Sequence, residues 1–405
     1  MGYTKDTIKG VTWVGGFRIF TRIFSFVKLA VLARLLSPNE FGSFGLALLV
    51  LTLVETITQS GISVFLIQER KNVFKYINSA YFLSVIRGLL IFLFLYLSAF
   101  FIAGFFGSLS SVKLIQLISI VALIRGFSNP ARVIYLKNLE FRKEIYFSTV
   151  VFLVDSIVSI IFAFWLRSPS TLVWGLLAGA LAENVMSWIF INIRPKFEFK
   201  KEQFGEMFKK GKWFAGFSIS DFLFEHGDDF VVGKLLNTNA LGIYQAAYKI
   251  SILPITEISR VFNTVTFPVY SNISGDRKRL LRAFKRITLS ILIVIVPFSI
   301  LLYVYSDDVV SIILGDKWLE VIPVLKILSI FGLIRAFGVS VYPLFSSLKR
   351  QNYVAVISFT GVFVMMVTIV PLILEFGILG AGYSVLFASV ISIPMTIYYI
   401  IKLFT

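Results

Sequence analysis

The chain contains one sequence segment twice, and this duplication restricts its architecture more than any other feature. Residues 33–42, ARLLSPNEFG, return 200 positions later at 233–242 as GKLLNTNALG. A second, shorter repeat relates residues 123–127 to residues 333–337 at an offset of 210. Two otherwise parallel halves therefore differ by an insertion of about ten residues, and such halves are typical of membrane transporters.

The composition indicates that the halves lie in a bilayer. Hydrophobic residues make up 57% of the 405 residues, charged residues make up 15%, and the mean hydropathy is +0.86. These values do not fit a soluble globule and predict an integral membrane protein. Apolar runs of about 20 residues, the length that spans a bilayer, occur about twelve times. They are residues 11–33, 41–64, 78–106, 112–136, 145–166, 171–193, 211–235, 240–265, 285–305, 320–347, 353–374 and 378–401.

The sequence thus predicts an all-α integral membrane protein with about 12 transmembrane helices. Its two lobes of six helices are expected at residues 1–200 and 201–405. Because Lys and Arg near helix ends stay in the cytoplasm, basic clusters at 70–75, 194–212 and 277–286 place both termini there. We expect a multi-pass protein of the cytoplasmic (inner) cell membrane.

The net charge of +17 is explained by the membrane topology that the predicted spans imply. In a soluble protein this charge would suggest nucleic-acid binding. Here it follows from the cytoplasmic cations, together with attraction to anionic membrane lipids. No nucleic-acid partner is predicted.

Ionisable residues inside membrane spans are costly and tend to face a water-filled path or a partner. On the first predicted helix, Arg18, Arg22 and Lys28 share one polar side, and the opposite side is apolar. This pattern predicts a helix that lines a cavity and receives an anion. In the alternative interpretation, Arg18 and Lys28 extend their charges to the two membrane surfaces, although Arg22 lies too deep to do so.

The equivalent helix of the second half carries the opposite charge. Its carboxylates fall on one side of the helix and are Asp221, Glu225, Asp228 and Asp229. Four groups this close cannot all ionise cheaply, so some are expected to be protonated or paired. The cluster either couples transport to H⁺ or Na⁺, with a gate between Asp228 and Lys28, or forms a static ion-pair network between the lobes.

His226 is the only histidine of the chain and adjoins this cluster. An imidazole near carboxylates titrates in the range useful for proton coupling. It lies off the acidic side of the helix, however, and a single histidine is more typical of a structural group. One histidine and no cysteine predict no metal site.

Further cations lie inside the predicted spans. Lys249 and Arg260 are three turns apart on the eighth span, so they share one face and are predicted to contact substrate. Arg125 and Arg335 are repeat equivalents, which favours a structural pairing used in both halves. The available counter-charges are Glu55, Asp155, Glu183 and Glu257.

Several stretches resemble a known family. They are residues 33–47 (ARLLSPNEFGSFGLA), 61–68 (GISVFLIQ), 78–82 (NSAYF), 174–179 (WGLLAG) and 379–383 (LGAGY). The chain resembles, over nearly its whole length, the Wzx-like polysaccharide or oligosaccharide-lipid flippases of the MOP exporter superfamily. The similarity is greatest to the branch that exports O-antigen of lipopolysaccharide, exopolysaccharide and teichuronic acid.

The resemblance implies two six-helix lobes of the multidrug and toxin extruder (MATE) type, around a central cavity with alternating access. The cargo would be an undecaprenyl-diphosphate-linked oligosaccharide, whose diphosphate suits Arg and Lys in a cleft of low dielectric constant. The substrate-binding residues would be Arg18, Arg22, Lys28, Lys249 and Arg260. We further expect transport to be coupled to H⁺ or Na⁺ and the protein to cooperate with a polysaccharide polymerase or export protein. No cofactor is expected.

Two other functions remain open from the sequence. A MATE-type multidrug or organic-cation antiporter needs a cavity of net negative charge, which the acidic seventh span partly supplies. A membrane glycosyltransferase or polymerase needs a large outer loop with catalytic carboxylates, whereas the first outer loop is little more than Ser37–Glu40. We therefore predict a transporter with no catalytic residues.

Overall fold

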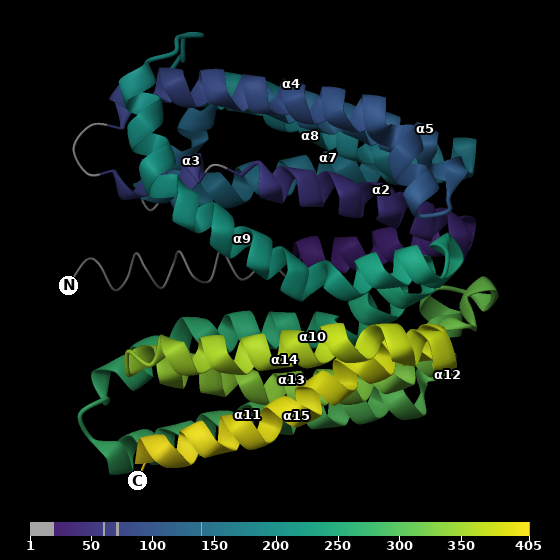
Figure 1. Ribbon diagram of the computed structural model, residues 1–405, viewed down its shortest axis with the longest axis vertical. Coiled ribbons are helices and arrows are strands. Elements are labelled where there is room, and N and C mark those ends of the chain that lie inside the picture. The colour runs from purple at the N-terminus through teal and green to yellow at the C-terminus, as the bar shows by residue number, and fades with distance from the viewer. Residues whose placement is uncertain (1–19, 60, 70–72, 139, 405) are drawn as a thin grey trace. The chain divides into compact units, whose positions relative to one another are not determined.

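The computed structural model describes residues 20–59, 61–69, 73–138 and 140–404, and every regular element among them is helical (Figure 1). The chain divides into two compact units, Met1–His226 and Gly227–Thr405. The boundary falls inside one long helix, α9 (Lys201–Leu235). In the described part of the chain, nine helices are long and apolar enough to span a membrane.

In the first unit, α5 lies between several of the longer helices. It packs along α4 and also contacts α2 and α8, while α7 packs along α8. The unit begins with a helix over residues 20–35. The other elements are α2 (Pro38–Ile57), α3 (Ile62–Gln68), α4 (Phe74–Phe105), η1 (Leu109–Ser111), α5 (Val112–Gly126), η2 (Pro130–Arg132), α6 (Val133–Lys137), α7 (Phe141–Leu166) and α8 (Ser170–Phe190).

In the second unit, α13 has the largest buried share among the nine candidate spans and packs against α10, α11 and α15. The helix pair α14 and α15 runs side by side, as Figure 1 shows. The elements are α10 (Thr238–Asn272), α11 (Arg277–Val304), α12 (Ser306–Ile313), η3 (Asp316–Trp318), α13 (Val321–Ser347), α14 (Gln351–Phe376) and α15 (Ile378–Phe404). Trp318 and Phe345 are fully buried in its core.

The duplicated segment forms the same local structure in both copies. In each copy a helix ends, two residues form a turn, and a second helix begins. Ser37 caps α2 by accepting from the backbone of Glu40, whose carboxylate accepts from Ser37 in return. At the equivalent position, Asn237 caps α10 by accepting from the backbone of Ala240. The repeat therefore encodes a helix junction with a polar cap.

Some helices differ in extent from the predicted spans. The expected span 112–136 ends at Gly126, because Asn129 caps a separate turn at Pro130, and proline disfavours helical backbone before it. The predicted spans 211–235 and 240–265 lie on α9 and α10, which are 35 residues each and carry several charges. Residues 11–19 of the predicted first span, 11–33, lie outside the described residues.

Side-chain hydrogen bonds join the start of α4 to the segment before α9 and to the first turn of α9. Asn78 donates to Glu198 at 3.0 Å, and Ser79 donates to Gln203 at 2.5 Å. The hydrogen bond from Asn78 and the ammonium of Lys200, 3.1 Å from the carboxylate, hold the pKa of Glu198 below its usual range. These contacts fix the beginning of α9 within the first unit.

Candidate functional site

An ion pair lies among the membrane-spanning helices of the first unit. The ammonium of Lys28, on the helix over residues 20–35, lies 2.7 Å from Oδ2 of Asp155 on α7. Both side chains are largely buried, with 16% and 15% of their surface exposed. The hydroxyl of Ser159, one turn along α7, donates to the other oxygen of Asp155 at 3.4 Å. A charge held in this environment needs its counter-charge, because water is largely excluded.

Two glycines of α8 create the space for this ion pair. A Cβ on Gly175 would lie 1.8 Å from the Ser159 hydroxyl and 2.6 Å from the backbone oxygen of Asp155. A Cβ on Gly179 would lie 3.0 Å from the Cβ of Asp155. Small residues four positions apart let membrane helices approach closely. The WGLLAG segment thus presses α8 against the turn of α7 that carries the carboxylate.

A second charged cluster is centred on Arg132, which follows α5. Its guanidinium contacts Glu144 at 2.5 Å and Glu183 at 2.6 Å, and Ser148 accepts from it at 2.9 Å. The same group lies 4.1 Å from the centre of the Phe147 ring. Carboxylates on two sides and an aromatic face fully engage this arginine, which is the pattern of a structural clamp.

Arg125 extends this cluster toward α2 with looser contacts. It lies 3.3 Å from Glu55 and 4.0 Å from Glu183, and 40% of its side chain is exposed. Arg87 of α4 donates to the backbone oxygen of Glu55 at 2.6 Å. The predicted counter-charges Glu55 and Glu183 therefore lie beside Arg125, which the sequence places inside a predicted span.

In the second unit, Asp228 is buried and accepts a hydrogen bond from the hydroxyl of Tyr244 at 2.7 Å. The ring of Tyr244 lies 6.1 Å from that of Tyr248, one turn further along α10. Tyr248 in turn accepts from Arg335 of α13 at 2.7 Å. A buried carboxylate and an arginine are thus each hydrogen-bonded to one of two neighbouring tyrosines within one unit. The hydrogen bonds at the two ends of this row can stabilise the charges of Asp228 and Arg335.

The remaining predicted site residues are placed as follows. Arg18 and the side chains of Asp221 and Arg260 lie outside the described residues. Arg22, Asp229 and His226 are half-buried, and Lys249 and Glu225 are exposed. The imidazole of His226 packs 5.0 Å from the ring of Phe222.

The partners Tyr244 and Glu144 were not singled out from the sequence. Tyr244 and Tyr248 are four residues apart and therefore share a helix face, a signal that sequence alone contains. Glu144 follows two basic residues of a predicted cytoplasmic end, which concealed its role. In the described part of the chain, no group of three His, Cys, Asp or Glu residues is arranged to hold a metal ion.

The chain is similar in sequence to several known proteins. A family model described as "Polysaccharide biosynthesis protein" matches residues 31–323. The lipopolysaccharide biosynthesis protein WzxC of Escherichia coli (strain K12) is 24% identical over 340 residues, which cover 84% of this chain and 69% of that protein. The teichuronic acid biosynthesis protein TuaB of Bacillus subtilis (strain 168) is 26% identical over 344 residues, with coverage of 82% and 69%. The probable low-salt glycan biosynthesis flippase Agl15 of Haloferax volcanii is 24% identical over 235 residues, with coverage of 56% and 48%.

Two solved structures share the fold. The lipid II flippase MurJ in its inward closed conformation matches with a TM-score of 0.76 and 16% identity, over 97% of this chain and 89% of that chain. An inward-facing MATE family transporter of the MOP superfamily matches with a TM-score of 0.73 and 12% identity, over 95% and 94%. These likenesses confirm the predicted all-helical membrane fold of the MATE type.

Proposed function

Because this chain belongs to the polysaccharide biosynthesis protein family, whose model matches residues 31–323, we propose that it is a flippase for polysaccharide repeat units. The family resemblance read from the sequence is thereby confirmed. The chain is a multi-pass membrane transport protein and not an enzyme. The proposed substrate is an undecaprenyl-diphosphate-linked oligosaccharide, which moves from the cytoplasmic to the outer leaflet by alternating access of the lobes 1–200 and 201–405.

The family match carries this proposal, and the Lys28 ion pair supports it. Among the described residues one carboxylate holds Lys28, at 2.7 Å, so this contact has to break before its ammonium can bind a phosphate. A diphosphate offers several anionic oxygens, and charge-assisted hydrogen bonds to it are strong in a site from which water is excluded. We infer that the diphosphate competes with Asp155 for Lys28, and that Arg18, Arg22, Lys249 and Arg260 complete the binding site.

Ion coupling is assigned to the acidic part of α9, at Asp221, Glu225, His226, Asp228 and Asp229. The buried position of Asp228 supports this assignment, because a carboxylate in a membrane span gains or loses a proton or Na⁺ at a large change in free energy. The hydrogen bond from Tyr244 holds the carboxylate in one orientation. An H⁺ or Na⁺ gradient would then drive the cycle, with both termini in the cytoplasm and a polysaccharide polymerase or export protein receiving the product.

Transport of a radiolabelled undecaprenyl-diphosphate oligosaccharide in proteoliposomes tests the proposal. We expect Lys28→Ala and Arg22→Ala to slow translocation by about 10- to 100-fold, the loss of one charge-assisted hydrogen bond to phosphate. Lys113→Ala is the matched control, because Lys113 is an exposed lysine at the start of α5. Unchanged transport in Lys28→Ala and Arg22→Ala would contradict the proposed binding site.

The same vesicles test the coupling. Asp228→Asn should abolish the response to an imposed H⁺ or Na⁺ gradient, while the exposed control Asp308→Asn should retain it. A gradient response that persists in Asp228→Asn would remove α9 from the coupling mechanism. Uptake of organic cations, without translocation of any lipid-linked sugar, would instead favour the MATE-type antiporter.

A further inference from the structure

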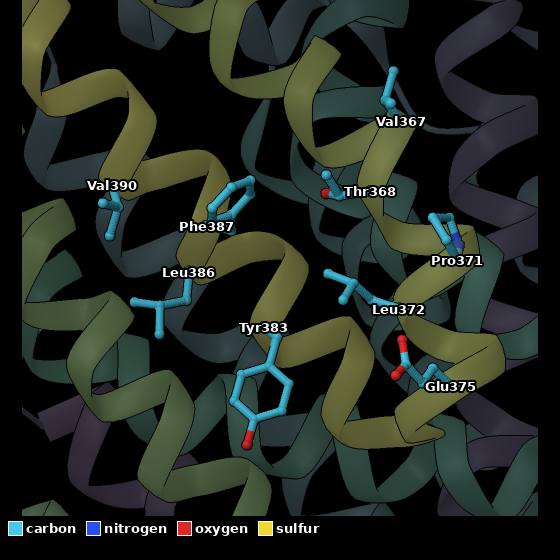
Figure 2. Close-up of a pocket in the computed structure, with 9 residues that line it drawn as sticks. All are labelled: Val367, Thr368, Pro371, Leu372, Glu375, Tyr383, Leu386, Phe387 and Val390. Atoms are coloured by element: carbon cyan, nitrogen blue, oxygen red, sulfur yellow. The ribbon is translucent and has the colours of Figure 1, made fainter.

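A pocket opens between α14 and α15 of the second unit. Its volume is about 530 Å³, within the range of about 300–1,000 Å³ that is usual for small-molecule sites. The lining is almost entirely apolar, and Leu372 of α14 and Phe387 of α15 are among its residues. Figure 2 shows Glu375 and Tyr383 at one end of the pocket and Val367 and Val390 at the other.

The two helices are fixed on both sides of the pocket, so the space is part of their packing. A Cβ on Gly380 would lie 2.0 Å from the backbone oxygen of Leu372, which shows how closely the helices approach near their connection. Deeper in the pair, the hydroxyls of Thr368 and Ser384 form a hydrogen bond of 2.9 Å. Ser384 is fully buried, and this contact closes the pocket toward the interior.

The dimensions of the pocket match one chain of one membrane leaflet. Glu375 is the second-last residue of α14, which places it at the level of the lipid headgroups. Val367 lies eight residues earlier, about 12 Å away along the helix. A leaflet has a hydrocarbon thickness of about 15 Å, half that of the whole core. Because α14 and α15 are both candidate membrane spans, hydrocarbon chains are the medium that reaches this pocket.

The charge at the mouth selects the headgroup. Glu375 is exposed and is the one ionisable carboxylate among the lining residues. It disfavours an anionic headgroup and, for the same reason, the diphosphate of the transport substrate. A primary ammonium can donate hydrogen bonds to a carboxylate, whereas a quaternary ammonium has no N–H to donate. The hydroxyl of Tyr383, at the same end, adds a polar group at the depth where tyrosine is common in membrane proteins.

We propose that the groove between α14 and α15 binds a phospholipid with a primary-amine headgroup, one acyl chain filling the pocket and the ammonium contacting Glu375. None of the residues proposed to bind the transport substrate lines this groove. It holds a lipid of the surrounding bilayer rather than the polyprenyl chain that is transported.

Native mass spectrometry of the protein, released from nanodiscs, measures the lipids that stay bound. The nanodiscs contain equal amounts of phosphatidylethanolamine, phosphatidylcholine and phosphatidylglycerol with identical chains, and a small amount of undecaprenyl phosphate. We expect one phosphatidylethanolamine to be retained with a preference of about two- to fivefold, which is the strength of an exposed ion pair. Equal retention of all headgroups, or preferential retention of undecaprenyl phosphate, would overturn the proposal.

Two variants separate the headgroup from the chain. Glu375→Gln keeps the shape of the pocket mouth. This variant should still retain a lipid but should bind the three headgroups about equally. Leu372→Trp fills the groove and should remove the bound lipid. Leu374→Trp is the matched control, because Leu374 lies two residues away on the same helix and is 75% exposed outside the pocket. If Leu372→Trp fails to fold, Glu375→Gln still decides the question, since an unchanged preference in that variant refutes the ammonium contact.

Discussion

Replacing Asp155 by leucine should destabilise the first unit, because it leaves the ammonium of Lys28 without the carboxylate that it contacts at 2.7 Å. Breaking a fully buried pair from one side costs about 3–5 kcal/mol, whereas an exposed pair is worth at most about 1 kcal/mol. With 16% and 15% of the two side chains exposed, we expect a loss of about 2–3 kcal/mol in the free energy of unfolding. For a unit of this size the melting temperature should fall by about 5–10 °C.

Thermal unfolding of the detergent-solubilised protein, followed by size-exclusion chromatography of heated samples, measures this change. The double variant Lys28→Met/Asp155→Leu removes both charges and should recover most of the lost stability, since no unpaired ion remains. Lys28→Met alone should cost less than Asp155→Leu, because the carboxylate of Asp155 keeps its hydrogen bond from Ser159 in that variant.

Measuring transport in the same variants distinguishes an effect on function from an effect on stability. The double variant should be stable but slow in the proteoliposome assay, because it lacks the cation proposed to bind the diphosphate. If the double variant melts as low as Asp155→Leu, the reasoning is refuted, since the unpaired charge of Lys28 would then not be the cause of the instability.

Three further predictions concern packing, the arginine cluster and the loop before α9. Gly175→Ala should prevent α7 and α8 from packing and lower the yield of monodisperse protein, whereas Gly205→Ala, where an added Cβ meets nothing within 4 Å, should leave it unchanged. Arg132→Met should lower the melting temperature more than Arg125→Met. Arg132 contacts its carboxylates at 2.5 and 2.6 Å, more tightly than Arg125 does, and its side chain is 23% exposed, whereas that of Arg125 is 40% exposed. Because the pKa of Glu198 is lowered in the folded state, its contribution to stability is present above its ordinary pKa and is lost as the pH falls through the lowered value. Glu198→Gln should therefore flatten the decline of the melting temperature in acid, and an unchanged pH profile would contradict this role.

The fold was largely predictable because its signals are local. Apolar runs give the spans, and the repeated segment gives a capped helix junction in both halves, at Ser37 and at Asn237. The break within the span 112–136 was also encoded, by Asn129 followed by Pro130, but the apolar residues on both sides concealed it. Hydropathy measures how well a segment fits the bilayer and does not report where its backbone turns.

The candidate site was less predictable, because partners across helices depend on packing. The sequence identified Lys28 as an intramembrane cation and Asp155 as one of several counter-charges, without joining them. The contact is made possible by Gly175 and Gly179, which admit the α7 backbone to the face of α8. Glycine spacing predicts that two helices approach closely, but not which turn of the second helix lies there. Tyr244 was missed for a related reason, since its hydroxyl reaches Asp228 only through the packing of α10 against the end of α9.

The contrast between Lys28 and Arg132 indicates which cation can take part in transport. A phosphate that bound Arg132 would have to replace two carboxylates and a serine hydroxyl, and would disturb the contact with the ring of Phe147. A phosphate that bound Lys28 would replace one carboxylate oxygen, and the released Asp155 could keep its hydrogen bond from Ser159. A substrate shifts a conformational equilibrium only through contacts that differ between the states. An exchangeable pair provides such a difference, because the lysine changes partner, whereas Arg132 is held from several sides and has no such exchange to offer.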